Sequence, residues 1–159
     1  MKKIILNFVL LISFSGFVLA QTGGSIYNPT ANVESDFQVV LKTAKSENKF
    51  VLLQIGGNWC SWCLKFHKFL AEDVQLDSIV KANYVKLLVN YSEENKNEAF
   101  LKKMGFPQRF GYPVFVITNS DGQVIHIQDS GYLEGEGGYD RKKVKSFLLN
   151  WTKKSVSGN

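Results

Sequence analysis

The two cysteines of the chain stand in a short segment, "GGNWCSWCLKFH", between an apolar run and a helical pattern. The apolar run at residues 50–55 predicts a buried strand, and two glycines end it. Cys60 then begins a helix, and Cys63 lies one turn further in. Free N–H groups and the dipole at a helix start stabilise a thiolate. This order predicts an α/β fold that presents a reactive cysteine pair after a strand.

Other uses of the pair require residues that the sequence does not supply. Haem attachment needs a histidine directly after the second cysteine, where Leu64 stands. A structural zinc site usually needs four ligands, commonly from two separated cysteine pairs. This chain has one cysteine pair, and its only histidines are His67 and His126. An inert disulfide across so short a loop constrains the unfolded chain little. A redox pair is therefore favoured for Cys60 and Cys63. The alternatives are a soft-metal site with His67 and a non-catalytic interaction module.

The remaining pattern predicts one domain in which helices alternate with strands. Helices are expected from about residue 35, at 61–72, at 74–82, at 92–104 with Ser92 as its cap, and at 140–151. Strands are expected at 49–56, 84–90, 112–118 and 123–128, the last two joined by the hairpin signal "NSDG". This order predicts a central mixed β-sheet with helices on both faces.

The first twenty residues predict a cleaved export signal. They have a basic start, an apolar stretch and Ala20 at a suitable cleavage point, and Ser13 and Gly16 interrupt the stretch. A membrane span needs about 20 apolar residues, so a retained anchor is the less favoured alternative. Export places the chain in an oxidising compartment, most simply the periplasm, with secretion as the alternative.

Beyond the signal, we expect a flexible lead-in at 21–32, the folded domain at 33–152 and a C-terminal tail at 153–159. Loss of two lysines with the signal lowers the formal charge from +5 to +3. The basic residues are scattered and are not interleaved with aromatics, which argues against nucleic-acid binding.

"WCSWC" after a buried strand, followed by "GYPVFVIT" and "DGQVI", resembles the thioredoxin superfamily, and more closely its exported thioredoxin-like branch. The resemblance covers nearly all of the chain after the lead-in. It implies a thiol–disulfide oxidoreductase in which Cys60 is the exposed nucleophile and Cys63 the buried resolving thiol. It implies no dissociable cofactor and no metal, because the cysteine pair is the redox group. Partners would be exported protein or small-molecule thiols and disulfides, and a membrane electron relay or another redox protein.

The same resemblance implies a shell around the cysteines. Trp59 matches the tryptophan before the nucleophile, and Tyr112-Pro113 matches the family's cis-proline, which lies opposite the cysteines and beside bound peptide. Ser61 and Trp62 stand between the cysteines in place of the usual Gly-Pro. These five residues are the expected substrate-contacting shell.

The sequence departs from the family pattern at a position that bears on proton transfer. Thioredoxins commonly carry a buried aspartate six residues before the first cysteine, where Gln54 stands here. Because an amide does not titrate, proton transfer must use water, another residue or the solvent. Lys86 aligns with the lysine that usually neighbours that acid. His67 lies on the same helix face as Cys63, one turn on, where it packs, tunes the thiols or binds metal.

Overall fold

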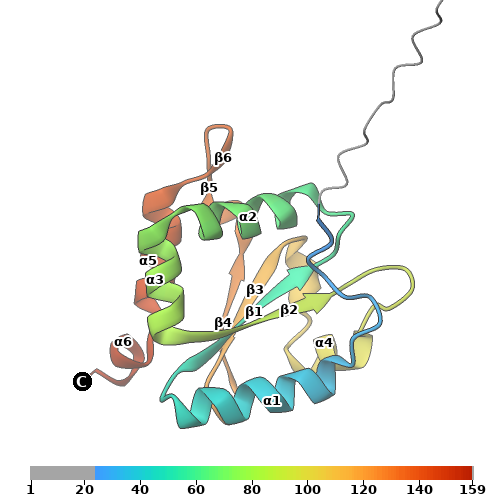
Figure 1. Cartoon of the computed structure of the whole chain (residues 1–159), viewed down its shortest axis with the longest axis horizontal. Coiled ribbons are helices and arrows are strands. Elements are labelled where there is room, and N and C mark those ends of the chain that lie inside the picture. The colour runs from blue at the N-terminus through green and yellow to red at the C-terminus, as the bar shows by residue number, and fades with distance from the viewer. Residues whose placement is uncertain (1–23, 159) are drawn as a thin grey trace, which may run out of the picture.

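The computed structural model describes residues 24–158 (Figure 1), and the predicted export signal lies outside them. The strands are β1 (Phe50–Gly56), β2 (Tyr84–Asn90), β3 (Val114–Thr118), β4 (Val124–Asp129), β5 (Glu134–Gly135) and β6 (Gly138–Tyr139). The α-helices are α1 (Val33–Ser46), α2 (Ser61–Glu72), α3 (Val74–Asn83), α4 (Glu98–Lys103), α5 (Arg141–Asn150) and α6 (Lys153–Ser157). Two 3-10 helices are η1 (Pro107–Phe110) and η2 (Ser130–Leu133). Within residues 24–158, no helix is long and apolar enough to cross a membrane.

The strand that leads to the cysteines lies inside a four-stranded sheet of order β2-β1-β3-β4. β1 is parallel to β2 and antiparallel to β3, and β3 is antiparallel to β4. β5 and β6 form a separate two-stranded hairpin. The predicted α/β fold with a central mixed sheet is confirmed.

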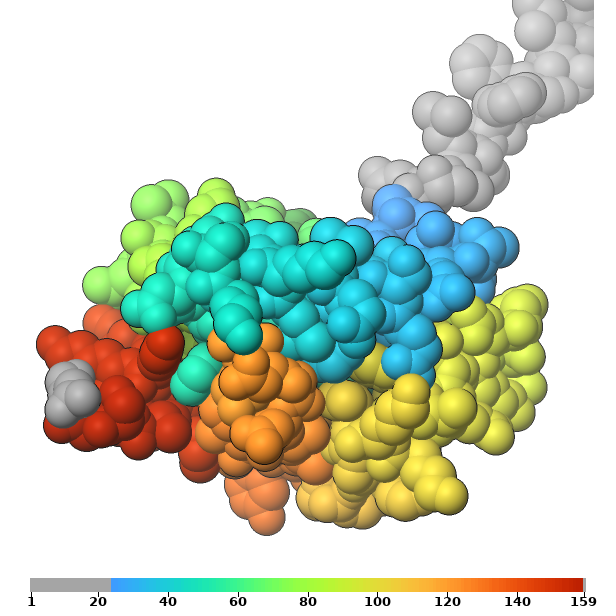
Figure 2. All heavy atoms as spheres, turned by 90° about the horizontal axis from the view of Figure 1, so that it is seen from below, coloured from blue at the N-terminus to red at the C-terminus, as the bar shows by residue number. Residues whose placement is uncertain are grey.

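Helices cover both faces of the sheet because both faces of β1 are apolar. Side chains alternate along the strand, so that Leu52 joins a core with α2, α3 and α5, whereas Val51, Leu53 and Ile55 join a core with α1 and α4. Figure 1 shows α1 and α2 on opposite sides of the sheet. Figure 2 shows the molecule from the side that α1 covers, with the turn between β3 and β4 beside this helix. Gln54 is the one polar side chain of β1, and it lies on the α2 side.

The helix predicted from Ser92 begins later, because the Ser92 side chain is already bound. Asn90 Nδ2, at the end of β2, donates to Ser92 Oγ and to the carbonyl of Asn95, both at 3.1 Å. Ser92 and Asn95 also exchange two backbone hydrogen bonds. This turn displaces the start of α4 to Glu98. The sequence indicated Ser92 as a helix cap, but it did not indicate that Asn90 would bind the Ser92 hydroxyl.

The segment predicted as a flexible lead-in, residues 21–32, is packed against the domain over the part that the structure describes. The backbone N–H groups of Ile26 and Tyr27 both donate to Asn58 Oδ1 at 3.0 Å, and Asn58 Nδ2 donates back to the Tyr27 carbonyl at 2.8 Å. Tyr27 is only 1% exposed. The small and polar composition predicted mobility, whereas one buried aromatic side chain and one asparagine hold the segment in place.

The predicted C-terminal tail also contains regular structure. Thr152 caps α6, and its Oγ1 accepts a hydrogen bond from the backbone N–H of Ser155 at 3.1 Å. A hydroxyl that satisfies a free N–H at a helix start favours a short helix there.

The contact between α5 and the outer strand β2 gives a first test of the packing. Tyr84 is buried, and its hydroxyl donates to the Leu148 carbonyl at 2.7 Å. Tyr84→Phe removes the hydroxyl and leaves the Leu148 carbonyl without this hydrogen bond. We expect a loss of about 1–2 kcal/mol of unfolding free energy in urea denaturation. Tyr132→Phe, at an exposed position, is the matched control and should change nothing measurable. Equal stability of the two variants would contradict this packing.

Candidate active site

Cys60 is the N-cap residue of α2. Its backbone is extended, with φ −91° and ψ 100°, and its Sγ accepts a hydrogen bond from the backbone N–H of Cys63 at 3.1 Å. The turn is closed by a bond from the Cys60 N–H to the Gly57 carbonyl at 3.0 Å. A sulfur at this position receives N–H groups that have no partner within the helix, and the positive end of the helix dipole favours negative charge on it. Cys60 is therefore the cysteine whose thiolate the fold stabilises.

The two cysteines form a disulfide, with an S–S distance of 2.06 Å and a Cα–Cα distance of 5.2 Å. Cys60 is 6% exposed and Cys63 is completely buried. The asymmetry gives the two sulfurs different accessibility: only Cys60 borders the solvent. An incoming thiol or disulfide meets Cys60 first.

Two glycines allow this close packing, and neither needs a positive φ to do so. A Cβ on Gly56 would lie 2.4 Å from Cys63 Sγ, and a Cβ on Gly57 would lie 2.4 Å from Trp59 Nε1. Both distances are far below ordinary contact, so any side chain would displace its neighbour. The glycines at the end of β1 are therefore required by the approach of the sulfur and the indole to the backbone.

Three aromatic rings form one border of the disulfide. Trp59 is 59% exposed, yet its Nε1 donates to the Tyr91 carbonyl at 2.7 Å, which holds the ring. Trp59 meets Tyr112 edge-on at 5.4 Å, and Tyr112 stacks on Tyr91 at 4.8 Å. The Tyr112–Pro113 peptide bond is cis, and Tyr112 packs against the cysteine cluster. Burial, followed by its contacts with Tyr91, raises the pKa of Tyr112 above its ordinary value. The predicted residues Trp59, Tyr112 and Pro113 thus lie together beside the cysteines.

The two residues between the cysteines have different surroundings. Ser61 is exposed. Trp62 packs edge-to-face against Tyr139 of the β5–β6 hairpin at 5.3 Å, and the Lys65 ammonium lies 4.4 Å from the centre of the indole. Tyr139 Oη also donates to the Trp62 carbonyl at 3.3 Å. Trp62 is therefore held between Lys65 and Tyr139.

Gln54 lies beneath the disulfide and contacts both the buried cysteine and the N-terminal segment. Its Nε2 donates to the Cys63 carbonyl at 3.1 Å and to the Tyr27 hydroxyl at 2.8 Å. Tyr27 packs in one cluster with Cys60 and Cys63. Sequence reasoning missed Tyr27. The available signal was "IY", the one apolar pair in the small, polar stretch "QTGGSIYNPTAN".

Lys86 lies close enough to His67 for its positive charge to act on the imidazole. Burial, and then the charge of Lys86, lowers the pKa of His67 below its ordinary value. Burial likewise lowers the pKa of Lys86. In the part of the chain that the structure describes, His67 Nδ1 is buried without a hydrogen-bond partner. No three His, Cys, Asp or Glu side chains of residues 24–158 are grouped so as to hold a metal ion. The alternative of a Cys60-Cys63-His67 metal set therefore gains no support from the geometry.

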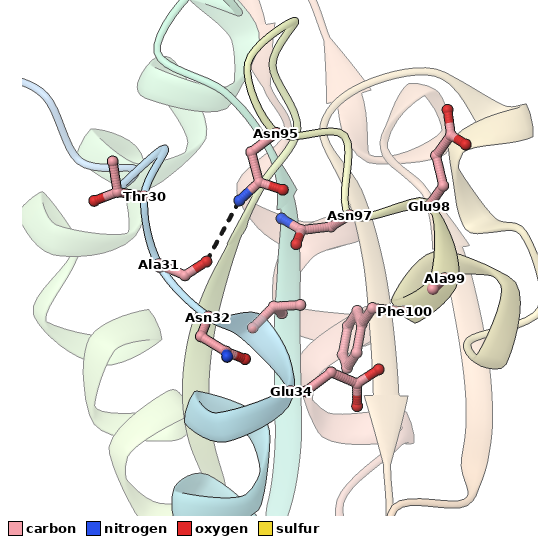
Figure 3. Close-up of a pocket in the computed structure, with 10 residues that line it drawn as sticks. Thr30, Ala31, Asn32, Glu34, Asn95, Asn97, Glu98, Ala99 and Phe100 are labelled. Atoms are coloured by element: carbon pink, nitrogen blue, oxygen red, sulfur yellow. Dashed lines mark hydrogen bonds between the residues drawn. The ribbon is translucent and has the colours of Figure 1, made fainter.

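A separate hollow lies away from the cysteines, between the start of α1 and α4 (Figure 3). Its lining combines polar and apolar side chains, and Asn95 Nδ2 donates to the Ala31 carbonyl at 3.4 Å across it. It contains neither cysteine nor histidine among its lining residues. The redox chemistry of this chain belongs to the other site.

Comparison with known proteins agrees with the fold and the site. Residues 37–137, more than half of the chain, match the family model described as a thioredoxin-like domain. The chain belongs to this thioredoxin-like family, within the thioredoxin superfamily, and with its disulfide-linked pair it is a thiol–disulfide oxidoreductase. None of the curated proteins is similar enough in sequence to count as a match.

Solved structures show the same fold at low sequence identity. A disulphide isomerase from Xylella fastidiosa Temecula1 is 22% identical with a TM-score of 0.71, and the match covers 80% of this chain and 96% of that one. A thioredoxin from Thermus thermophilus is 16% identical with a TM-score of 0.53, covering 76% and 88%.

The packing of Cys63 on Gly56 is open to a direct test. Gly56→Ala forces the buried sulfur to shift, and we expect a loss of about 1–3 kcal/mol of unfolding free energy, as for other overpacked sites. Gly138→Ala is the control, because a Cβ there would meet only the Lys65 side chain, at an ordinary 3.9 Å. Urea denaturation of both variants measures the difference. A Gly56→Ala protein as stable as wild type would refute the close approach.

The charge of Lys86 should be visible at His67. Lys86→Gln removes the repulsion and should raise the pKa of His67, while burial still keeps it below the ordinary histidine value. An NMR titration of the imidazole resonances measures the shift. Lys102→Gln, on α4 across the sheet, is the matched control for loss of one positive charge. An unchanged His67 pKa in Lys86→Gln would contradict the placement of the two groups.

Proposed function

We propose that the chain is an exported thiol–disulfide oxidoreductase whose nucleophile is Cys60 and whose resolving thiol is Cys63. One observation carries the assignment of roles: Cys60 caps α2 and keeps a small solvent-exposed fraction, whereas Cys63 is bonded to it from a fully buried position. The capping position favours the Cys60 thiolate, and burial disfavours a charged Cys63. Each sulfur is suited to a different half of an exchange reaction.

The reduced protein would act on a disulfide in two steps. The Cys60 thiolate attacks one sulfur of the substrate, a mixed disulfide forms, and the other substrate sulfur leaves as a thiolate. Cys63 then attacks the Cys60 sulfur, the bond from Cys60 to the substrate breaks, and the second thiolate leaves. Two electrons pass from the cysteine pair to the substrate. The same steps in reverse oxidise a substrate dithiol, so the pair needs no dissociable cofactor.

The substrate would lie along the aromatic border of the disulfide. Trp59 offers an exposed apolar surface whose indole is fixed by its hydrogen bond, and Tyr112 and Pro113 follow directly beside it. Ser61 is exposed on the same helix start. By resemblance to the superfamily, the backbone beside Pro113 would pair with an extended peptide. Trp62 is engaged with Tyr139 and Lys65, so we propose a lesser part for it.

The proposed location rests on the sequence of residues 1–20, which has the basic start, apolar stretch and small cleavage residue of an export signal. A periplasmic location follows most simply, with exported thiols and disulfides as substrates. Because each turnover changes the oxidation state of the pair, a second redox protein or a membrane electron relay would restore it.

Trapping experiments test the two roles separately. With glutathione disulfide as the probe, reduced Cys63→Ser should accumulate a stable mixed disulfide through Cys60, detected by intact-protein mass spectrometry. Reduced Cys60→Ser should react at least about 100-fold more slowly, because its remaining sulfur is buried and its thiolate is unfavourable. If Cys60→Ser reacted as fast as Cys63→Ser, the assignment would be wrong. If neither reacted and wild type did not cycle, the chain would be an interaction module.

A further inference from the structure

Gln54 stands where the superfamily commonly has a buried aspartate, so the proton transfer at Cys63 must be assisted in another way. To attack the mixed disulfide, the Cys63 thiol must give up a proton and carry a negative charge in a site with no solvent exposure. A thiolate in such surroundings is costly unless a hydrogen-bond donor faces it. Gln54 cannot accept the proton, and both hydrogens of its amide nitrogen are already donated.

Tyr27 lies where a donor is needed. A Cβ built on Gly56 would lie 2.4 Å from Cys63 Sγ and 3.0 Å from the Tyr27 hydroxyl oxygen. The sulfur and the hydroxyl thus border the same small space beside Gly56. Tyr27 is 1% exposed and packs in the cluster that contains both cysteines.

The hydrogen-bond pattern decides which way the Tyr27 hydroxyl points. The nitrogen of Gln54 must face the Cys63 carbonyl, because a carbonyl only accepts, and this same nitrogen contacts the Tyr27 oxygen. Tyr27 therefore accepts from Gln54 and keeps its own O–H hydrogen free. Among residues 24–158, no hydrogen bond donated by this hydroxyl is found. Burial raises the pKa of Tyr27, so the hydroxyl keeps its proton and acts as a donor and not as a base.

We propose that Tyr27 is a positioning residue for the second half of the exchange reaction, in which its hydroxyl donates a hydrogen bond to the Cys63 sulfur once the disulfide is open. The inference rests on the proposed roles of Cys60 and Cys63. The Cys63 proton passes to the departing substrate thiolate, the Cys63–Cys60 bond forms, and the bond from Cys60 to the substrate breaks. Tyr27 keeps its proton throughout and stabilises the charge that develops on Cys63.

The segment that carries Tyr27 is thereby part of the site. The family match begins at residue 37, so this hydroxyl comes from outside the matched domain. Asn58, two residues before Cys60, holds the segment through the backbone of Ile26 and Tyr27. The loop that presents the nucleophile and the segment that serves the resolving thiol are therefore fixed to each other.

The test separates the two steps of the reaction in the full mature chain. Reduced protein is mixed with glutathione disulfide and quenched with acid at intervals, and mass spectrometry follows formation and resolution of the mixed disulfide. In Tyr27→Phe, we expect formation within about twofold of wild type and resolution about tenfold slower, as for loss of one hydrogen bond to a charged group. Asn58→Ala, which frees the segment, should slow resolution selectively as well.

Tyr84→Phe is the matched control, since it also removes a buried tyrosine hydroxyl but lies at the contact with Leu148. It should alter neither step. Equal slowing of both steps in Tyr27→Phe would indicate a general structural role and would overturn the inference, as would resolution at the wild-type rate. If the wild-type protein itself formed no mixed disulfide, the proposed function would be wrong, and the inference about Tyr27 would be wrong with it.

Discussion

The close contact between the end of β1 and the first turn of α2 is the constraint on which the site depends. Cys63 Sγ fits against the backbone of Gly56 because no Cβ stands there. β1 is buried on both faces and paired on both edges, so Gly56 has little freedom to move. A rigid strand thus fixes the depth of one sulfur, and the helix cap fixes the other near the surface. The different accessibility of the two cysteines follows from this arrangement.

Two polar side chains, Gln54 and Tyr27, lie at the buried cysteine in the part of the chain that the structure describes, and neither is a carboxylic acid. Gln54 uses its amide nitrogen to connect the Cys63 carbonyl with Tyr27, and its Oε1 is buried without a partner among the described residues. A neutral amide costs less to bury than a carboxylate. The site therefore combines a neutral interior beneath Cys63 with the electropositive helix start at Cys60. The electrostatic difference between the two positions favours the thiolate of Cys60.

The sequence predicted what depends on local pattern. The apolar run of β1, the glycines and the position of Cys60 at a helix start follow from neighbours in the chain, and the structure has them as expected. Tyr27 was not predictable in this way, because its burial depends on Asn58, far away in the sequence. Ser92 has the features of a helix cap, but its hydroxyl is held in a turn by Asn90 at the end of β2. His67 lies on the predicted helix, yet its pKa is lowered first by burial and then by the charge of Lys86, which lies on β2.

A glutathione redox titration of the protein tests the central claim most directly. The chain has two cysteines, so alkylation and mass spectrometry report on one pair without interference. We expect a reversible two-electron transition, with the same midpoint whether the titration starts from the oxidised or from the reduced protein. A pair that stays oxidised at every glutathione ratio, or that cannot re-form once reduced, would contradict a redox role for Cys60 and Cys63.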